Sequence, residues 1–333
     1  MSLKRCALAF LVVFAFACVS FEADAPGIQL VRESGSDTLH GIADPTHGAI
    51  KWSHGAFLYG EFGTYPPAVY TLDREGNWIS SATVRAPNGA QVWSHDYDRG
   101  TDGSIVLSGQ YSSDQGAVPF IAWISADGKT QRLVPTTPYF PNMLSVAPDG
   151  TVWTIGHEMI NWDTKAPGLD PEAGVLRHFD ATGKLLGSAL PQSRFKTRHE
   201  QFRLASGLLV AKSDRLGWFA PREENGQYIE ISTATMAVQS YPGLPAPSRY
   251  DRADALALSD SGMVTLQIED RSPLARATYS FDRATSKWVP LRVPAIGGYN
   301  CTPILTGTDG ESLVFQYAQS VAFFRVAGSL NLE

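Results

Sequence analysis

Ser145-Val146-Ala147-Pro148-Asp149-Gly150-Thr151-Val152-Trp153 decides the fold of this chain, because it joins two apolar segments through a tight turn that ends in glycine. Turns of this kind recur along the sequence. Their glycines are Gly55, Gly103, Gly150, Gly207, Gly262 and Gly310, which are separated by 48, 47, 57, 55 and 48 residues. Glycine accepts a positive φ and aspartate bonds to its own turn, so each turn predicts a β-hairpin.

A second family of turns lies between the first. It includes Asp73–Gly76, Asp127–Gly128 and Asp180–Gly183, with versions that lack glycine at Ser232–Thr235 and Asp282–Thr285. Each unit therefore contains two hairpins, that is, four antiparallel strands. Four strands repeated about every 50 residues are typical of a propeller blade. The sequence predicts an all-β fold, a six-bladed β-propeller of four-stranded antiparallel blades.

The two ends of the repeat predict how the ring closes. The sixth unit reaches Phe323–Val326 with no room for its outer strand, while Ile28–Arg32 is an extra strand that precedes the first unit. We expect this N-terminal strand to pair into the last blade, which removes two sheet edges. An open solenoid or a β-sandwich is the alternative.

Composition agrees with one globular domain over residues 26–333. The chain of 333 residues is 44% hydrophobic and 18% charged, with 30 glycines and 21 prolines. This is enough apolar material for a large core and much turn chemistry. The net charge is −6 and no run of lysine or arginine occurs. Nucleic acid is therefore not an expected partner, because its binding depends on clustered cations.

Residues 1–25 are typical of an export signal. Lys4 and Arg5 precede an uncharged, mostly apolar run, Cys6–Ala17, which is shorter than the roughly 20 residues that a membrane-spanning helix needs. Two processing sites are open: cleavage after Ala25, or a lipoprotein-like site at which Cys18 is lipidated. Either predicts an extracytoplasmic location, periplasmic, secreted or lipid-anchored, with membrane contact only through such an anchor.

The segment Pro141–Trp153 resembles the repeat of six-bladed propellers of the NHL and streptogramin-lyase-like group, as do the paired turns at Asp180–Gly183 and Asp260–Gly262. The resemblance covers most of residues 27–328 as a repeat pattern. It implies the architecture. It transfers no catalytic residue, because this group includes lyases, lactonases and binding proteins.

The loops between blades and between the two hairpins of a blade share one face of a propeller, and we call it the loop face. This face is the expected binding site. Two His-Glu pairs from consecutive units, His157-Glu158 and His199-Glu200, are candidates for a catalytic acid–base site or a divalent metal site. The alternative is that these are solvated loop residues or pairs that satisfy one another.

A second candidate set consists of arginines and aromatic residues that suit an anionic or sugar ligand. Its members are Arg198, Arg249, Tyr250, Arg252 and Tyr299, with Trp162 and Trp218 as loop tryptophans that contact the ligand. Salt bridges between blades are the alternative for the arginines. We expect the strand tryptophans Trp78, Trp93, Trp123, Trp153 and Trp288 to pack, and His40, His47, His54 and His95 to have no role.

The sequence thus predicts an exported propeller that binds a small molecule or a protein on its loop face. The alternative is a metal-assisted lyase or hydrolase at the channel mouth, for which a divalent metal ion would be the cofactor. No serine nucleophile elbow, P-loop or dinucleotide fingerprint occurs.

Overall fold

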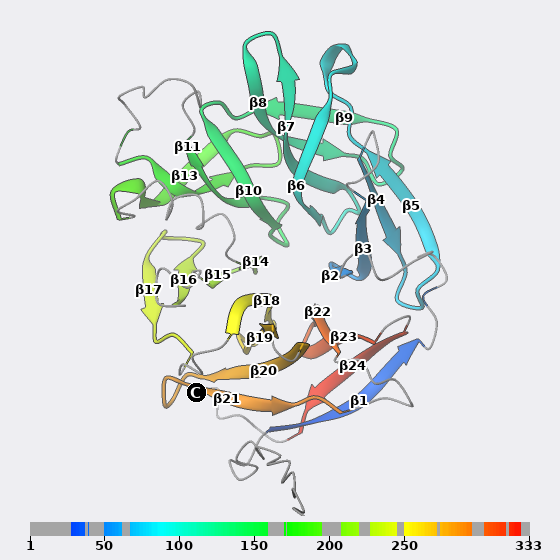
Figure 1. The fold of residues 1–333 in the computed structure, drawn as a ribbon, viewed down its shortest axis with the longest axis vertical. Coiled ribbons are helices and arrows are strands. Elements are labelled where there is room, and N and C mark those ends of the chain that lie inside the picture. The colour runs from blue at the N-terminus through cyan, green and yellow to red at the C-terminus, as the bar shows by residue number, and fades with distance from the viewer. Residues whose placement is uncertain are drawn as a thin grey trace, which may run out of the picture.

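The computed structural model describes residues 28–36, 39, 50–61, 67–158, 170, 172–194, 208–219, 227–244, 250–271, 274–294, 303–317 and 320–327. This part of the chain is all β, with two short 3₁₀ turns, η2 (Pro87–Gly89) and η3 (Gln192–Arg194). Its sheets stand around a common axis as the sheets of a propeller do (Figure 1).

Four sheets have four antiparallel strands each, arranged in the order of the sequence. The first contains β2 (Lys51–Ser53), β3 (Ala56–Glu61), β4 (Ala68–Leu72) and β5 (Trp78–Thr83). The second contains β6 (Val92–Arg99), β7 (Ile105–Ser113), β8 (Gly116–Ile124) and β9 (Gln131–Pro135). The third contains β10 (Tyr139–Val146), β11 (Val152–Glu158), β12 (Gly174–Phe179) and β13 (Leu185–Pro191). The fourth contains β14 (Leu208–Ala211), β15 (Arg215–Phe219), β16 (Tyr228–Ser232) and β17 (Val238–Tyr241).

The remaining eight strands form one continuous sheet in the order β18-β19-β20-β21-β1-β24-β23-β22. One half contains β18 (Tyr250–Leu258), β19 (Val264–Arg271), β20 (Leu274–Asp282) and β21 (Lys287–Arg292). The other half contains β1 (Ile28–Ser36), β22 (Ile304–Asp309), β23 (Ser312–Tyr317) and β24 (Ser320–Val326).

The sheet count corrects one prediction and the position of β1 agrees with another. The separate four-stranded sheets number four, not the predicted six, because β1 bonds on both sides. It pairs antiparallel with β24 from Leu30 to Ser36, as predicted, and its residues Ile28 and Gln29 also pair parallel with β21. This second pairing joins what the sequence treats as two sheets.

The aspartate turns form as the sequence predicts. In the turn before β7, Asp102 Oδ1 accepts hydrogen bonds from the backbone N–H of Ser104 at 2.9 Å and from its hydroxyl at 2.7 Å. Asp149 binds Thr151 in the same way before β11, at 2.9 and 2.7 Å. Gly103 and Gly150 occupy these turns at φ +85° and +82°, a conformation that costs glycine little.

The core of the described residues is divided among the faces where consecutive units meet. Trp153 of the third sheet and Trp218 of the fourth belong to one such cluster, and Trp52 and Phe323 belong to the cluster that joins the first sheet to the last strands. Strands that bury both faces lose strict alternation. Trp78 and Trp93 correct the expectation that all strand tryptophans pack, since they are 58% and 42% exposed.

Two buried glutamines, on β23 and β19, connect segments that are far apart in sequence. Gln316 Oε1 accepts a hydrogen bond from the backbone N–H of Ile50 at 3.1 Å, where the last unit meets the first. Gln267 Oε1 accepts one from Leu305 N at 2.9 Å, between the two halves of the eight-stranded sheet. Both side chains therefore satisfy backbone donors that water cannot reach.

We expect Gln316→Leu to lower the free energy of unfolding by about 1–3 kcal/mol, because the buried N–H of Ile50 loses its acceptor while the side-chain volume is nearly kept. Urea unfolding followed by tryptophan fluorescence measures this. The control is Gln239→Leu on the exposed outer strand β17. Equal midpoints for the two variants would contradict a role for Gln316 in closing the ring.

Candidate functional site

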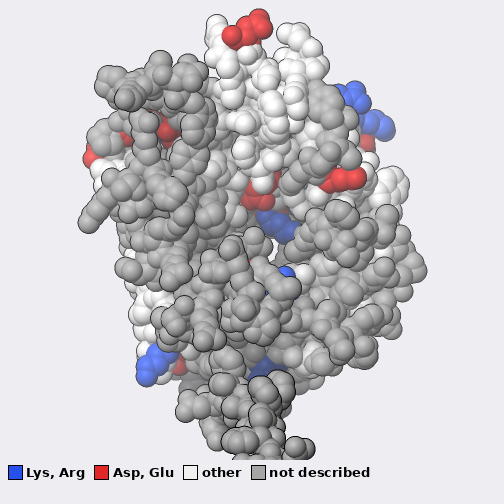
Figure 2. Space-filling model, in the orientation of Figure 1, with Lys and Arg blue, Asp and Glu red and all other residues white. Residues whose placement is uncertain are grey.

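An axial cavity of about 530 Å³ lies inside the ring of sheets. The first strand of each unit contributes to its wall. One lining residue from each of these strands is Lys51 (β2), Asp98 (β6), Ser145 (β10), Val210 (β14), Ala255 (β18) and Thr306 (β22). Cavities of this size hold small molecules. Figure 2 shows positively and negatively charged side chains next to one another near the centre of the visible face.

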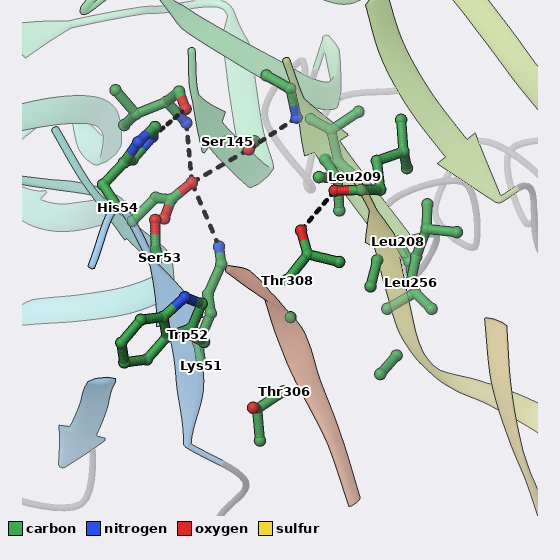
Figure 3. Close-up of a pocket in the computed structure, with 18 of the residues that line it drawn as sticks. Lys51, Trp52, Ser53, His54, Ser145, Leu208, Leu209, Leu256, Thr306 and Thr308 are labelled. Carbon is green, nitrogen blue, oxygen red and sulfur yellow. Dashed lines mark hydrogen bonds and ion pairs between the residues drawn. The ribbon is translucent and has the colours of Figure 1, made fainter. Parts of the chain in front are cut away.

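A chain of polar contacts crosses four of the inner strands (Figure 3). Lys51 Nζ donates to the carbonyl of Tyr97 at 3.0 Å and lies 3.6 Å from Asp98 Oδ2. The same carboxylate oxygen accepts hydrogen bonds from the hydroxyl of Ser145 at 3.1 Å and from Val146 N at 2.9 Å. Ser145 Oγ in turn accepts one from Ala211 N at 3.0 Å. We call Lys51, Asp98 and Ser145 the polar belt.

The belt holds its charges although it is buried. Burial opposes ionisation of Asp98, but the charge of Lys51 and the hydrogen bonds from Ser53 and Val146 outweigh it and keep the pKa of Asp98 below its ordinary value. Burial also works against the charge of Lys51, yet Asp98 and Asp96 raise the pKa of this lysine. Lys51 is therefore an ammonium group at neutral pH and not a nucleophilic amine.

Asp96, two residues from Asp98 on β6, differs from it. Its Oδ2 accepts a hydrogen bond from Leu144 N at 2.8 Å and its Oδ1 accepts one from Tyr97 N at 2.8 Å. Burial raises the pKa of Asp96, and the charge of Lys51 with these hydrogen bonds offsets that only in part. Two carboxyl groups on one strand are thus driven in opposite directions by their surroundings.

The opposite part of the wall includes several apolar side chains. β14 and β18 contribute Leu208, Val210, Ala255 and Ala257 to the lining, and Figure 3 shows Leu208, Leu209 and Leu256 across the cavity from the belt. The cavity is therefore amphipathic. His54, for which the sequence suggests no role, also lines it, and its Nε2 donates to the carbonyl of Val146 at 3.0 Å.

His157 and Glu158, the two described members of the predicted acid–base and metal site, contact different groups. His157 is buried in β11 and stacks on Phe140, and burial together with the nearby His95 lowers its pKa to about 4, so it is neutral. Glu158 pairs instead with Arg177. Successive strand residues point to opposite faces, which explains why the two separate. His199 and Glu200 lie outside the described residues, and within these residues no three His, Cys, Asp or Glu side chains form a metal-binding group.

Trp218 corrects a further prediction. It is not a loop residue in contact with solvent but part of β15, with 0% exposure, packed between the third and fourth sheets. Alternation along β15 places Trp218 and Leu216 on the same face. Tyr250 and Arg252 belong to β18 and not to a loop, and only their backbone is described. Arg198, Arg249, Tyr299, Trp162 and Cys18 lie outside the described residues.

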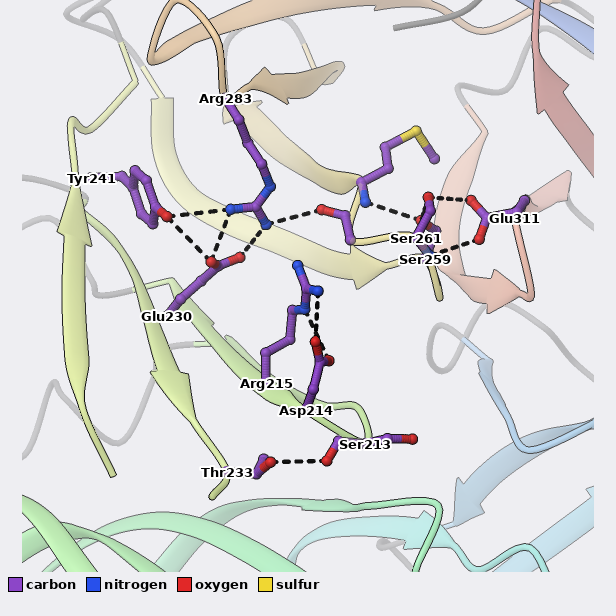
Figure 4. A network of polar contacts seen from close by, with 12 residues as sticks. Ser213, Asp214, Arg215, Glu230, Thr233, Tyr241, Ser259, Ser261, Arg283 and Glu311 are labelled. Carbon is purple, nitrogen blue, oxygen red and sulfur yellow. Dashed lines mark hydrogen bonds and ion pairs between the residues drawn. The ribbon is translucent and has the colours of Figure 1, made fainter. Parts of the chain in front are cut away.

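A second polar network joins the fourth sheet to the next one (Figure 4). Arg283 binds both carboxylate oxygens of Glu230, with Nη1 at 2.9 Å from Oε2, and it also donates to the carbonyl of Gly262 at 3.0 Å and to the hydroxyl of Tyr241 at 3.3 Å. Burial opposes the charge of Glu230, but Arg283 and Tyr228 lower its pKa. Both terminal nitrogens of Arg283 donate to groups within the protein, so we interpret this network as structural.

Comparison with known proteins shows the fold alone. No family model and no curated protein matches the chain. Among solved structures, it is similar to a luciferin-regenerating enzyme at 13% identity and a TM-score of 0.54, covering 89% of this chain and 95% of that chain. A Bacteroides fragilis protein described as exported is similar at 8% identity and 0.52, covering 90% and 95%. A DUF4221 family member from Bacteroides vulgatus is similar at 13% and 0.52, covering 91% and 99%. These neighbours are propeller-like proteins.

We expect Ser145→Ala to destabilise the protein by about 1–3 kcal/mol, because Asp98 loses a donor and Ala211 N loses its acceptor, both in buried surroundings. Chemical unfolding measures the change. Ser188→Ala, at an exposed position of β13, is the control. Should both variants unfold at the same urea concentration, the belt would not be a stabilising connection.

We expect Glu230→Gln to lower the free energy of unfolding at about pH 7, and to lower it much less at about pH 3. The pKa of Glu230 in the folded protein lies below its ordinary value of 4.5. The ionised carboxylate therefore stabilises the fold at pH values above 4.5, and this stabilisation is lost as the pH falls through the folded pKa. Unfolding free energies of wild type and variant at both pH values test this, with the exposed Glu75→Gln as control. A gap between wild type and Glu230→Gln that stays constant with pH would contradict the ionic role.

Proposed function

We propose that this protein is an extracytoplasmic, six-bladed propeller that binds a small molecule in its axial cavity. The observation that carries the proposal is the amphipathic wall, in which a charged belt fixed by hydrogen bonds faces apolar side chains of β14 and β18. A few fixed polar groups in an otherwise apolar cavity are typical of small-molecule sites.

The propeller has six blades if each half of the eight-stranded sheet is counted as one blade. The two halves contribute opposite sides of one hydrophobic cluster, with Met263 and Leu291 from one half and Leu313 and Phe315 from the other. They therefore pack face to face as neighbouring blades do. The parallel bridge at Ile28 and Gln29 is then a connection between two blades and not part of a wider blade.

The extracytoplasmic location rests on the export signal of residues 1–25 and is supported by the likeness to a Bacteroides protein described as exported. Within the described residues, none of the helical segments has the length and hydropathy to cross a membrane. We also propose, from the Pro141–Trp153 repeat, that the protein belongs to the NHL and streptogramin-lyase-like group.

A metal-assisted lyase or hydrolase is the alternative that the sequence suggests. Its residue His157 stacks on Phe140 of the neighbouring strand β10, and Glu158 pairs with Arg177 of β12. Arg198, Arg249, Tyr299 and Trp162 lie outside the described residues, and their contact with a ligand stays a prediction from the sequence. Ligand binding by the cavity is the function that the described geometry supports better.

We expect Val210→Trp to abolish binding of a small neutral probe, cyclohexylmethanol, because an indole at this lining position fills the space opposite the belt. Saturation-transfer NMR of the probe measures binding in the weak range expected for a fragment. The control is Val238→Trp on the exposed strand β17. Absence of binding to wild type, or binding that survives Val210→Trp, would contradict the cavity as the site.

A further inference from the structure

The charges that line the axial cavity do not balance. Among the described residues, five carboxylates and two ammonium groups contribute to the wall: Asp96, Asp98, Asp254, Asp260 and Asp309, with Lys51 and Lys212. A ligand that enters the cavity meets the sum of these groups and of the cations that lie just behind them, because partly buried charges are screened less than exposed ones.

Four of the five carboxylates have a cation of their own. Asp98 lies 3.6 Å from Lys51, Asp260 lies 2.8 Å from Lys212, Asp254 lies 2.8 Å from Arg276, and Asp309 contacts Arg74. Asp96 is the exception, since no cation of the described chain lies within ion-pair distance of it. Its partners are the two backbone N–H groups of Leu144 and Tyr97.

The surroundings of Asp96 agree with this count. Lys51 is shared between Asp96 and Asp98, so one ammonium group faces two carboxyl groups. Burial raises the pKa of Asp96, as expected for a carboxylate whose charge is only partly offset. A cation that binds here would supply the missing compensation.

We propose that the cavity selects a small organic monocation, an ammonium group on an apolar body, with the ammonium bound at Asp96 and the body against β14 and β18. This inference rests on the proposed function and names its ligand class. An ammonium group donates charge-assisted hydrogen bonds to a carboxylate. The apolar body matches Leu208, Val210 and Ala255 in the wall.

Two other ligand classes fit less well. A divalent metal ion takes several oxygen or nitrogen ligands, and the described residues offer no group of three acidic, histidine or cysteine side chains. An anion would approach Lys51, but two carboxylates flank that ammonium and the net charge repels the anion.

Three probes with one carbon skeleton test the inference: cyclohexylmethylamine, cyclohexylmethanol and cyclohexanecarboxylate, titrated into the full chain at pH 7 and followed by calorimetry or ligand-observed NMR. The amine is expected to bind about tenfold more tightly than the alcohol, because one charge-assisted hydrogen bond contributes a gain of that size. The carboxylate is expected to bind more weakly than either. Asp96→Asn should remove the preference for the amine and leave the affinity for the alcohol unchanged. Asp114→Asn, at an exposed hairpin position, is the matched control.

The outcomes separate the inference from the proposed function. The inference is overturned if the amine and the alcohol bind with equal affinity, or if the preference for the amine survives Asp96→Asn. In either case, binding of the alcohol still supports the proposal that the cavity binds a small molecule. Failure of all three probes rejects both. If Asp96→Asn does not fold, wild type is titrated at decreasing pH: the preference for the amine must shrink as Asp96 takes up a proton, and a constant preference overturns the inference.

Discussion

β1 is hydrogen-bonded on both sides, to β24 along most of its length and to β21 through Ile28 and Gln29. This double pairing is the constraint on which the arrangement of the other strands depends. It supplies the outer strand of the last unit, and it holds the first and last parts of the chain in one sheet. Only a closed ring keeps the six innermost strands facing one another, and the axial cavity exists because they do.

The polar belt is the second consequence of closure. Lys51, Asp98 and Ser145 come from three different sheets, and their contacts form only when these sheets stand side by side around the axis. Charged groups in such a place are costly unless they are paired and hydrogen-bonded. Asp98 meets that requirement with an ammonium group, a hydroxyl and a backbone N–H. The geometry of the site is therefore a property of the assembled ring and not of any single hairpin.

Much of the fold follows from short-range chemistry that a sequence displays. Turns such as Pro148-Asp149-Gly150 depend on residues two or three apart, and the missing outer strand at Val326 points directly to Ile28–Arg32. The parallel bridge at Ile28 and Gln29 involves only two residues and leaves no periodic signal, so the sheet count differs. The sequence places Trp218 in a loop because only a short hairpin turn separates it from the Leu208–Leu209–Val210 segment. In so short a hairpin the sequence pattern hardly distinguishes strand from loop.

The candidate site was less accessible to sequence reasoning. His-Glu pairs draw attention as chemical groups, but His157 and Glu158 are neighbours on a strand and contact different partners. The sequence feature that could have indicated the cavity is the pair Asp96 and Asp98. These two carboxylates are spaced as on one face of a strand, in an inner strand where apolar residues are usual. Their partner Lys51 lies in another sheet, and no local pattern connects the two.

The position of β1 also bears on how the molecule is made. β1 cannot complete its pairing until β24, which lies far along the chain, has been synthesised. Contacts between such distant segments form slowly, because the loop between them must close first. The ring can therefore close only after β24 has left the ribosome.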